Sequence, residues 1–464
     1  MISSPQAKLN PMISHMSIPK VQFTNESVTA YGGLSLFKTF QALCGWDEIL
    51  KRLEQKVFTL NRCTPFTVSK VVDEIIDSTV VGQFRVSYMD RLRWDPGLRR
   101  ITGSVILPSE RTIRRRLKAA TSRELRALLD ANQELLQLKA SLQGPREIDI
   151  DIDDSVCEVY GKQEGSMKGY NPRKHGGRSY KERYAFVAGS KELIYAQLNP
   201  GNYHSNTEFK DFFRLVEKSV PDNWFIRRIR ADRAFPDDEI LAYFEERTYS
   251  YVIKAKYTSR LKKVVEYLDQ HDLWEEVQDG LYTAELRIPL TNWEKARRFV
   301  FIRQRPVLKD PNNPEQINMF ELSYEWNVQA IVTNEEDMTP VQVWHCYNGR
   351  TGIENLIEEG KNSYAMDVNA HHDFRVNEII FTIRMLAYNW VNWFKQSVLP
   401  EEDNHWELKT MRENLMNIPA NVHGTHRKMN VNYPSFPPIE KRIRAVTSNL
   451  SNLKSTLSMV RLVS

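Results

Sequence analysis

The stretch EIDIDIDDSV, residues 147–156, decides the fold of this chain. Acidic residues and isoleucines alternate strictly along it, which is the two-residue period of a β-strand with one apolar face. The segment follows Gly144-Pro145, where helical periodicity ends. A sheet-containing domain is therefore expected to begin at about residue 146.

The residues after this strand predict a mixture of strands and helices. Strand-like runs occupy 184–188, 193–198, 225–231 and 249–254, and helical stretches near 207–220 and 236–247 separate the last three. The predicted order is three strands, helix, strand, helix, strand. This order is typical of an α/β domain whose later strands are joined by helical crossovers.

The remaining chain divides by composition and periodicity. Apolar residues recur at helical spacing through 34–60 and 125–142, and further long helices are expected from about 340 and over 376–395. We predict six segments: a flexible tail (1–20), a mainly helical N-terminal domain (21–145), the first part of the α/β domain (146–255), a β-rich insertion (256–322), its second part (323–400) and a C-terminal region (401–464).

Composition limits the class of protein. The 464 residues are 41% hydrophobic, enough for a core, and the formal net charge of +5 permits a nucleic-acid partner without requiring one. The four cysteines form no C-x-x-C pair, as expected for reduced thiols in the cytoplasm. No signal peptide is visible, and no apolar run approaches the roughly 20 residues of a membrane span.

The helix expected after Thr339 carries the first candidate site residues. Thr339 and Gln342 fit a capping box around Pro340. On one continuous helix ending near Gly360, the group Tyr347, Arg350, Glu354 and Lys361 falls within an arc of roughly 60°. This face presents an acid beside a phenol and two cations; the alternative is a solvated face with ion pairs between neighbouring turns.

Two aspartates stand at predicted strand ends. Asp153 ends the acidic strand, and Asp232 ends the apolar strand in RIRADRAF. Ligands of open α/β sheets gather beyond such ends, and a third acid, Glu354, is available from the helix. Oxygen ligands suit Mg²⁺ or Mn²⁺, and two such ions catalyse phosphodiester chemistry. By position alone, the other acids of the strand compete with Asp153.

The motifs resemble those of a known family. The spacing Y-x2-R-x3-E-x6-K, formed by Tyr347, Arg350, Glu354 and Lys361, resembles the signature of bacterial insertion-sequence DDE transposases. The segments DIDDSVCEVYGKQEGSMKGYNP, LNPGNYHSN, RIRADRAF and VTAYGGLSLF resemble insertion-sequence family thirteen-eighty, a relative of the piggyBac elements. The resemblance covers roughly residues 20–400.

The resemblance implies an RNase H-like catalytic domain, split into 146–255 and 323–400 by the β-rich insertion, and cut-and-paste DNA transposition. The motif D-x-[ST] selects Asp153, and the family pattern adds Asp232 and Glu354 as catalytic, metal-holding residues. Mg²⁺ is the implied cofactor, with Mn²⁺ as substitute. Double-stranded DNA, as terminal inverted repeats and target, is the implied partner of a dimer.

Several segments are candidates for DNA contact. The helix expected in LPSERTIRRRLKAA has Ser109 as its cap and is either a recognition helix or an ordinary charged surface helix. The Gly- and Lys-rich loop QEGSMKGYNPRKHGGRSYK is expected to touch the DNA backbone near the metals. The predicted DNA-binding residues are Tyr347, Arg350, Lys361, Arg111, Arg114, Arg115 and Lys118.

Two further features and three functions stay open. Trp293 and Trp326 fit buried packing or stacking on a flipped base, and His371-His372 is interpreted as a loop pair before a helix. The leading function is a cut-and-paste transposase. The alternatives are an RNase H-like metal nuclease without strand transfer and a domesticated DNA-binding protein that no longer cuts.

Overall fold

The acidic and isoleucine segment forms the strand β2 inside a ten-stranded mixed sheet. The computed structural model describes residues 26–57, 66–169, 176–203, 208–291, 293–304, 326–425 and 428–463. The strands of the large sheet are β2 (Arg146–Glu158), β3 (Met167–Lys168), β4 (Arg178–Val187), β5 (Leu193–Pro200), β6 (Trp224–Ala231), β7 (Ser250–Lys254), β8 (Glu275–Gln278), β9 (Leu281–Ile288), β10 (Arg297–Gln304) and β11 (Asn327–Thr333).

The sheet confirms the predicted mixed α/β class. Its strand order is β3-β4-β2-β6-β7-β11-β10-β9-β8, with β5 paired to β4. Strands β2, β6 and β7 run parallel, while β4 and β5 pair antiparallel beside them. The helices α8 (Phe209–Ser219) and α9 (Asp238–Glu246) form the two crossovers at the predicted places.

The predicted β-rich insertion contributes to this same sheet. Strands β8, β9 and β10 follow one another antiparallel, and β11 joins them to β7. The insertion also contains a helix that the sequence analysis did not predict, α10 (Ser259–Gln270), whose N-cap Thr258 accepts a hydrogen bond from the amide of Leu261. The charged loop KDPNNPEQ lies outside the described residues.

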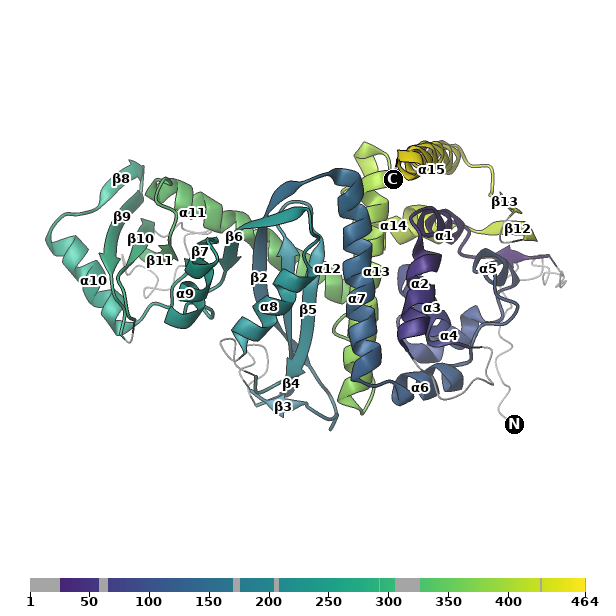
Figure 1. Ribbon diagram of the computed structural model, residues 1–464, viewed down its shortest axis with the longest axis horizontal. Helices are drawn as coiled ribbons and strands as arrows, with labels where there is room; N and C mark the ends of the chain where they lie inside the picture. The colour runs from purple at the N-terminus through teal and green to yellow at the C-terminus, as the bar shows by residue number, and fades with distance from the viewer. Residues whose placement is uncertain are drawn as a thin grey trace, which may run out of the picture.

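The N-terminal region is mainly helical, as predicted, and packs beside the sheet (Figure 1). Its helices are α1 (Leu34–Leu43), α2 (Trp46–Lys56), α3 (Val68–Val80), α4 (Val86–Leu92), α5 (Pro96–Ile101), α6 (Glu110–Ala119) and α7 (Ser122–Gln143). The predicted tail, residues 1–20, lies outside the described part of the chain.

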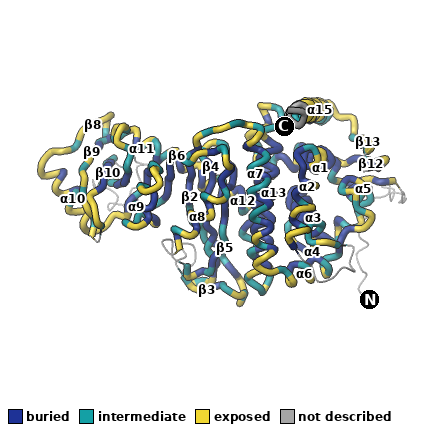
Figure 2. The backbone as a smooth tube through the Cα atoms, viewed as in Figure 1, coloured by how far each residue is buried: buried dark blue, intermediate teal, exposed yellow. Residues whose placement is uncertain are grey.

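The long helix α13 (Phe374–Val398) lies between the sheet and the N-terminal helices, and it contacts α7, α3 and β5. Most of its residues are buried, as expected of a helix that is covered on all sides (Figure 2). The rings of Trp390, Trp393 and Phe394 pack edge to face against Phe40 of α1. This aromatic contact joins the helical region to α13, which in turn contacts β5.

The C-terminal region returns to the N-terminal helices. After α14 (Leu408–Met411), the strands β12 (Ala420–Thr425) and β13 (Lys428–Asn432) form a small sheet with β1 (Val28–Thr29). The last helix, α15 (Pro437–Val463), contacts α1 and α13 and confirms the expected helical end. Within the described residues, no helix is long and apolar enough to cross a bilayer.

Candidate functional site

The candidate site begins with a ladder of charges across β2 and its parallel neighbour β6. Register places Asp149 beside Arg228 and Asp151 beside Arg230. Arg230 donates two hydrogen bonds to Asp151, at 2.6 and 2.8 Å, and Arg228 donates to Asp149 at 3.0 Å. The sequence RIR of β6 therefore neutralises the first two acids on this face of β2.

The ladder ends with two acids side by side. The last registered pair of β2 and β6 is Ile152 and Ala231, so Asp153 and Asp232 each stand one residue beyond it. Asp153 does not end its strand, as the sequence analysis expected, because β2 continues to Glu158 in antiparallel pairing with β4. It lies where the pairing with β6 ends.

The neighbouring Asp154 has a compensating partner of its own. Arg183 of β4 donates to both of its carboxylate oxygens, at 2.7 and 3.1 Å. Of the acids that compete with Asp153 at positions 149, 151 and 154, each is held by an arginine from a neighbouring strand. Asp153 is the one placed next to another acid.

The expected single helix after Thr339 is two helices joined by a tighter turn. The capping box of Thr339 and Gln342 is confirmed at the start of α11 (Pro340–Asn348). A 3₁₀ turn, Gly349–Thr351, then leads into α12 (Gly352–Tyr364), which continues past Gly360 and ends before Ala365 in a left-handed conformation. The prediction of one straight face was therefore wrong, because 3₁₀ residues advance by about 120° rather than 100°.

Gly349 allows this turn to approach β6. A Cβ atom there would lie 2.9 Å from Nη1 of Arg230. That nitrogen donates to the carbonyl oxygen of Cys346 at 2.8 Å, so a backbone acceptor of α11 is bonded to the sheet.

The residues of the helical motif reach the two aspartates in spite of the turn. The hydroxyl of Tyr347 donates to Oδ1 of Asp232 at 3.2 Å. Nη2 of Arg350 lies 2.9 Å from Oδ2 of Asp153, as an ion pair without hydrogen-bond alignment. Both side chains are buried, so in this structure they contact the carboxylates rather than an open DNA-binding surface.

The third acid, Glu354, is exposed on the first turn of α12. It lines an open cavity of about 500 Å³ together with Asp153 and Asp232. The rest of the lining is mostly polar and comprises Asp154, Ser155, Ile357, Glu358, Lys361, Asn362 and Asp367. The structure thus brings the three predicted carboxylates to one cavity.

Lys361 is fixed to the sheet from the same helix. Its ammonium donates to the hydroxyl of Ser155 at 2.6 Å and lies 3.2 Å from the carboxylate of Glu182 on β4. Glu182 is fully buried, and the sequence analysis missed it. The only sign of Glu182 in the sequence is a charged residue next to a run that is typical of a strand.

The surroundings of Asp153 disfavour the negative charge of its carboxylate. Burial raises the pKa of its carboxyl to about 7; Asp232 and Asp154 act in the same direction, and Arg350 opposes them. Burial and the charge of Asp232 also raise the pKa of Tyr347. A site that disfavours its own negative charge in this way favours a bound cation.

The donors suit a hard divalent cation, since the carboxylates at the cavity offer oxygen atoms alone. In the described chain, no group of three or more His, Cys, Asp or Glu side chains is assembled to hold a metal ion. Arg350 supplies the positive charge at Asp153 in this arrangement.

The basic segment forms α6, which begins as predicted with Ser109 accepting a hydrogen bond from the amide of Thr112. The apolar residues Ile113 and Leu117 are buried, while the four predicted DNA-binding residues of this helix are exposed: Arg111, Arg114, Arg115 and Lys118. The second predicted DNA-contacting segment, 163–181, is described except for residues 170–175.

The remaining candidates are placed as follows. Trp293 packs against Phe299, and Trp326 packs edge to face against Tyr282. His371 and His372 lie in the loop before α13, as interpreted from the sequence. Burial, together with the charge of Arg114, lowers the pKa of His371 to about 4.

Comparison with known proteins gives one family. The model of the family "Transposase DDE domain group 1" matches residues 11–455. No curated protein matches. Among solved structures, a piggyBac transposase synaptic complex with hairpin DNA is similar at 11% identity and a TM-score of 0.40, over 91% of this chain and 85% of that chain.

Proposed function

The chain belongs to the transposase DDE domain group 1 family, and from this premise we propose that it cuts DNA at the ends of a mobile element and joins them to target DNA. In this proposal the element is a bacterial insertion sequence. The substrate is double-stranded DNA, present both as terminal repeats and as target.

We assign the catalytic domain as RNase H-like, formed by the sheet around β2 and by α12. The strands β5, β4, β2, β6 and β7 are adjacent in that order and carry Asp153 and the approach to Asp232. The strands β8 to β10 and the helix α10 then form the insertion before the helix of Glu354.

Asp153, Asp232 and Glu354 are the proposed metal-holding residues. Divalent ions such as Mg²⁺ or Mn²⁺ would activate a water or a 3′-hydroxyl and stabilise the leaving oxygen of the phosphodiester. Tyr347 and Arg350 orient two of the carboxylates, and Lys361 holds Ser155 and Glu182 on the adjoining strands. Exposed Arg111, Arg115 and Lys118 on α6 are proposed to bind phosphates of the element end.

One observation carries the proposal. On the acidic face of β2 each earlier acid has an arginine from β6, and the pattern changes to acid beside acid only at Asp153 and Asp232. Glu354 lines the cavity at that position. Carboxylates that gather at one cavity, with Arg350 paired to one of them, are an arrangement that suits cation-dependent phosphoryl transfer.

The test is the substitution Asp232→Asn, which removes one charge while keeping the shape. Cleavage of repeat-ended DNA with Mg²⁺ and the joining of pre-cut ends should both be lost, while binding to the ends persists. Asp211→Asn, an exposed acid on α8 whose side chain is 69% accessible, is the matched control and should keep full activity.

The outcomes separate the alternatives. Cleavage at the wild-type rate by Asp232→Asn would reject the site. If the wild-type protein cleaves element ends but does not join pre-cut ends to target DNA, it is a nuclease. If the wild-type protein binds the ends and carries out neither reaction, it is a protein that no longer cuts.

A further inference from the structure

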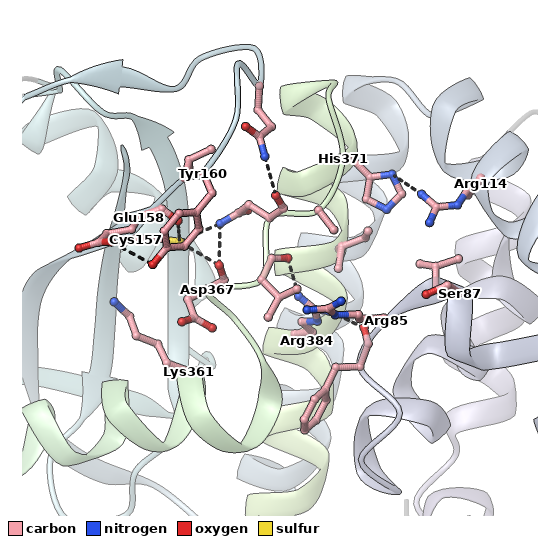
Figure 3. Close-up of a pocket in the computed structure, with 18 of the residues that line it drawn as sticks. Arg85, Ser87, Arg114, Cys157, Glu158, Tyr160, Lys361, Asp367, His371 and Arg384 are labelled. Atoms are coloured by element: carbon pink, nitrogen blue, oxygen red, sulfur yellow. Dashed lines mark hydrogen bonds between the residues drawn. The ribbon is translucent and has the colours of Figure 1, made fainter. Parts of the chain in front are cut away.

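A second cavity lies next to the acidic one and has no role in the function proposed so far. Its volume is about 730 Å³. One wall is the end of β2 with the residues that follow it, and the opposite wall comes from the N-terminal helices, at residues 84–87 and at Arg114 of α6 (Figure 3). The loop before α13 and Arg384 complete it.

The two cavities adjoin each other. Lys361 and Asp367 line both of them. A chain molecule whose reacting group lies at Asp153, Asp232 and Glu354 would therefore extend along Lys361 towards the second cavity.

The lining favours an anion. Four cations, Arg85, Arg114, Lys361 and Arg384, face two carboxylates, Glu158 and Asp367. Arg85 and Arg114 stand on the helical wall and are exposed. Arg114 pairs with Glu110 at 2.7 Å, but this pair lies at the surface, with side chains 43% and 31% exposed, so contact with a phosphate would not break a buried pair.

The cavity has a fixed shape. Arg384 is buried, and its guanidinium donates to the carbonyl oxygens of Phe84 at 2.9 Å, Val368 at 3.1 Å and Ala365. These carbonyls belong to the helical wall and to the loop after α12, so one side chain fixes the helical wall relative to the loop that completes the cavity.

An aromatic ring stands at the rim. Tyr160 is 87% exposed, directly after β2. Its hydroxyl donates to Glu158 at 3.2 Å, which orients the ring beside the cavity (Figure 3). An exposed ring on one wall of a cavity and arginines on the opposite wall can bind an unpaired nucleotide between them, because the ring stacks on the base and the cations hold the phosphate.

We propose that this cavity binds one or two unpaired nucleotides of the DNA strand next to the scissile phosphate, with the base on Tyr160 and phosphates on Arg85 and Arg114. The volume falls within the range of roughly 300–1,000 Å³ of small-ligand pockets, which suits a ligand of one or two nucleotides. The inference rests on the proposed function, since it takes the adjoining carboxylates as the place where DNA is cut.

The test compares two forked DNAs carrying the element end, in the Asp232→Asn background so that nothing is cut. One has an unpaired base next to the cleavage position, and the other has an abasic nucleotide there. The protein should bind the first roughly 5- to 150-fold more tightly, the range expected for stacking of one base on a ring. Tyr160→Ala should reduce the ratio of the two affinities to about one, and Tyr160→Phe should keep the wild-type ratio.

Two controls identify the source of the effect. Tyr267→Ala removes a tyrosine that is 47% exposed on α10, away from the cavity lining, and should leave the ratio unchanged. Arg85→Ala should weaken binding to both forks equally, because both contain the phosphate. The ratio is therefore specific to the base and to Tyr160.

The outcomes also distinguish this inference from the proposed function. If wild-type protein cuts element ends but the ratio is close to one, or if Tyr160→Ala retains the ratio, the inference is overturned and the function stands. If the protein neither binds nor cuts element ends, the proposed function fails and the inference falls with it.

Discussion

Replacing Arg350 by methionine should separate the electrostatic role of this residue from its packing. Arg350 and Asp153 form a pair at 2.9 Å, with side chains that are 4% and 16% exposed. Methionine keeps much of the length and the apolar contacts but removes the charge. In the variant, the carboxylate of Asp153 lies in a buried position beside Asp232, and the positive charge of Arg350 is missing.

The expected loss is large for a single residue. Breaking a buried ion pair by removing one partner costs about 3–5 kcal/mol when the other group stays charged. In a domain of about 200 residues each kcal/mol corresponds to roughly 2–4 °C of melting temperature. Arg350→Met should therefore melt several degrees below the wild type at alkaline pH.

The pH dependence has a definite sign. The pKa of Asp153 in the folded protein is raised from 3.8 to about 7, so its contribution to stability is fully present below about pH 4 and is lost as pH rises towards 7. Arg350 lowers this pKa, and its removal extends the loss above pH 7. The difference in stability between wild type and variant should be small at pH 5 and largest above pH 8.

The assay is thermal melting of both proteins at pH 5 and pH 8.5, with and without Mg²⁺. If Asp153 holds a cation, Mg²⁺ should narrow the difference at pH 8.5. Arg287→Met, which breaks a pair with Glu336 whose side chains are both 57% exposed, is the control and should change little at either pH. Equal differences at pH 5 and pH 8.5 would refute the electrostatic role of Arg350.

Two other cations, each with buried partners, give related predictions. Lys361→Met should lower the free energy of unfolding by about 3–5 kcal/mol in chemical denaturation, because it leaves the fully buried Glu182 without its cation. Adding Glu182→Gln should restore part of that loss. If the double variant is no more stable than Lys361→Met, the ion pair is not the cause of the loss. Arg412→Met should cost about 2–4 kcal/mol, since the buried guanidinium donates to the carbonyl oxygens of Thr79, Val80 and Ser363, and an unchanged melting curve would contradict this.

Periodicity predicted most of the sheet that surrounds the site. The alternation of acids and isoleucines gave β2, and the order of strands and helices through residue 254 follows from hydrophobic pattern and turn residues. The pattern did not reveal that β8 to β10 extend this same sheet. Such pairing depends on contacts between β11 and both β7 and β10, which are distant in sequence from one another.

The sequence predicted three acids that line one cavity, but not the geometry that brings them there. The 3₁₀ turn, Gly349–Thr351, has ordinary right-handed backbone angles at its ends. Because many residue types adopt such angles, the sequence contains no signal for the turn. The turn reflects a tertiary contact, the approach of Arg230 to Cys346. The partners of Arg350 and Lys361 were also missed, because ion pairs between a helix and a sheet depend on packing rather than on spacing along the chain.

One feature of the sequence could have identified Asp153 without a resemblance. From Arg228 to the residue after β6 the chain reads RIRAD, with the same two-residue period as the acids of β2. Two parallel strands with these patterns pair arginine with aspartate until the last step, where aspartate meets aspartate. Matching charges along neighbouring strands would thus have selected Asp153 over Asp149 and Asp151.

The same ladder explains why the helical motif needs its particular residue types. Of the two acids left beside each other at the end of β6, Asp153 accepts a hydrogen bond from the amide of Asp154, and β6 provides no arginine opposite either of them. The segment after Thr339 supplies a partner for each acid: the phenol of Tyr347 donates to Asp232, and the guanidinium of Arg350 forms an ion pair with Asp153. Glu354 and Lys361 follow from the same segment, one exposed at the cavity and the other bonded to the sheet. The motif therefore positions the helix that bears the third acid by holding the first two.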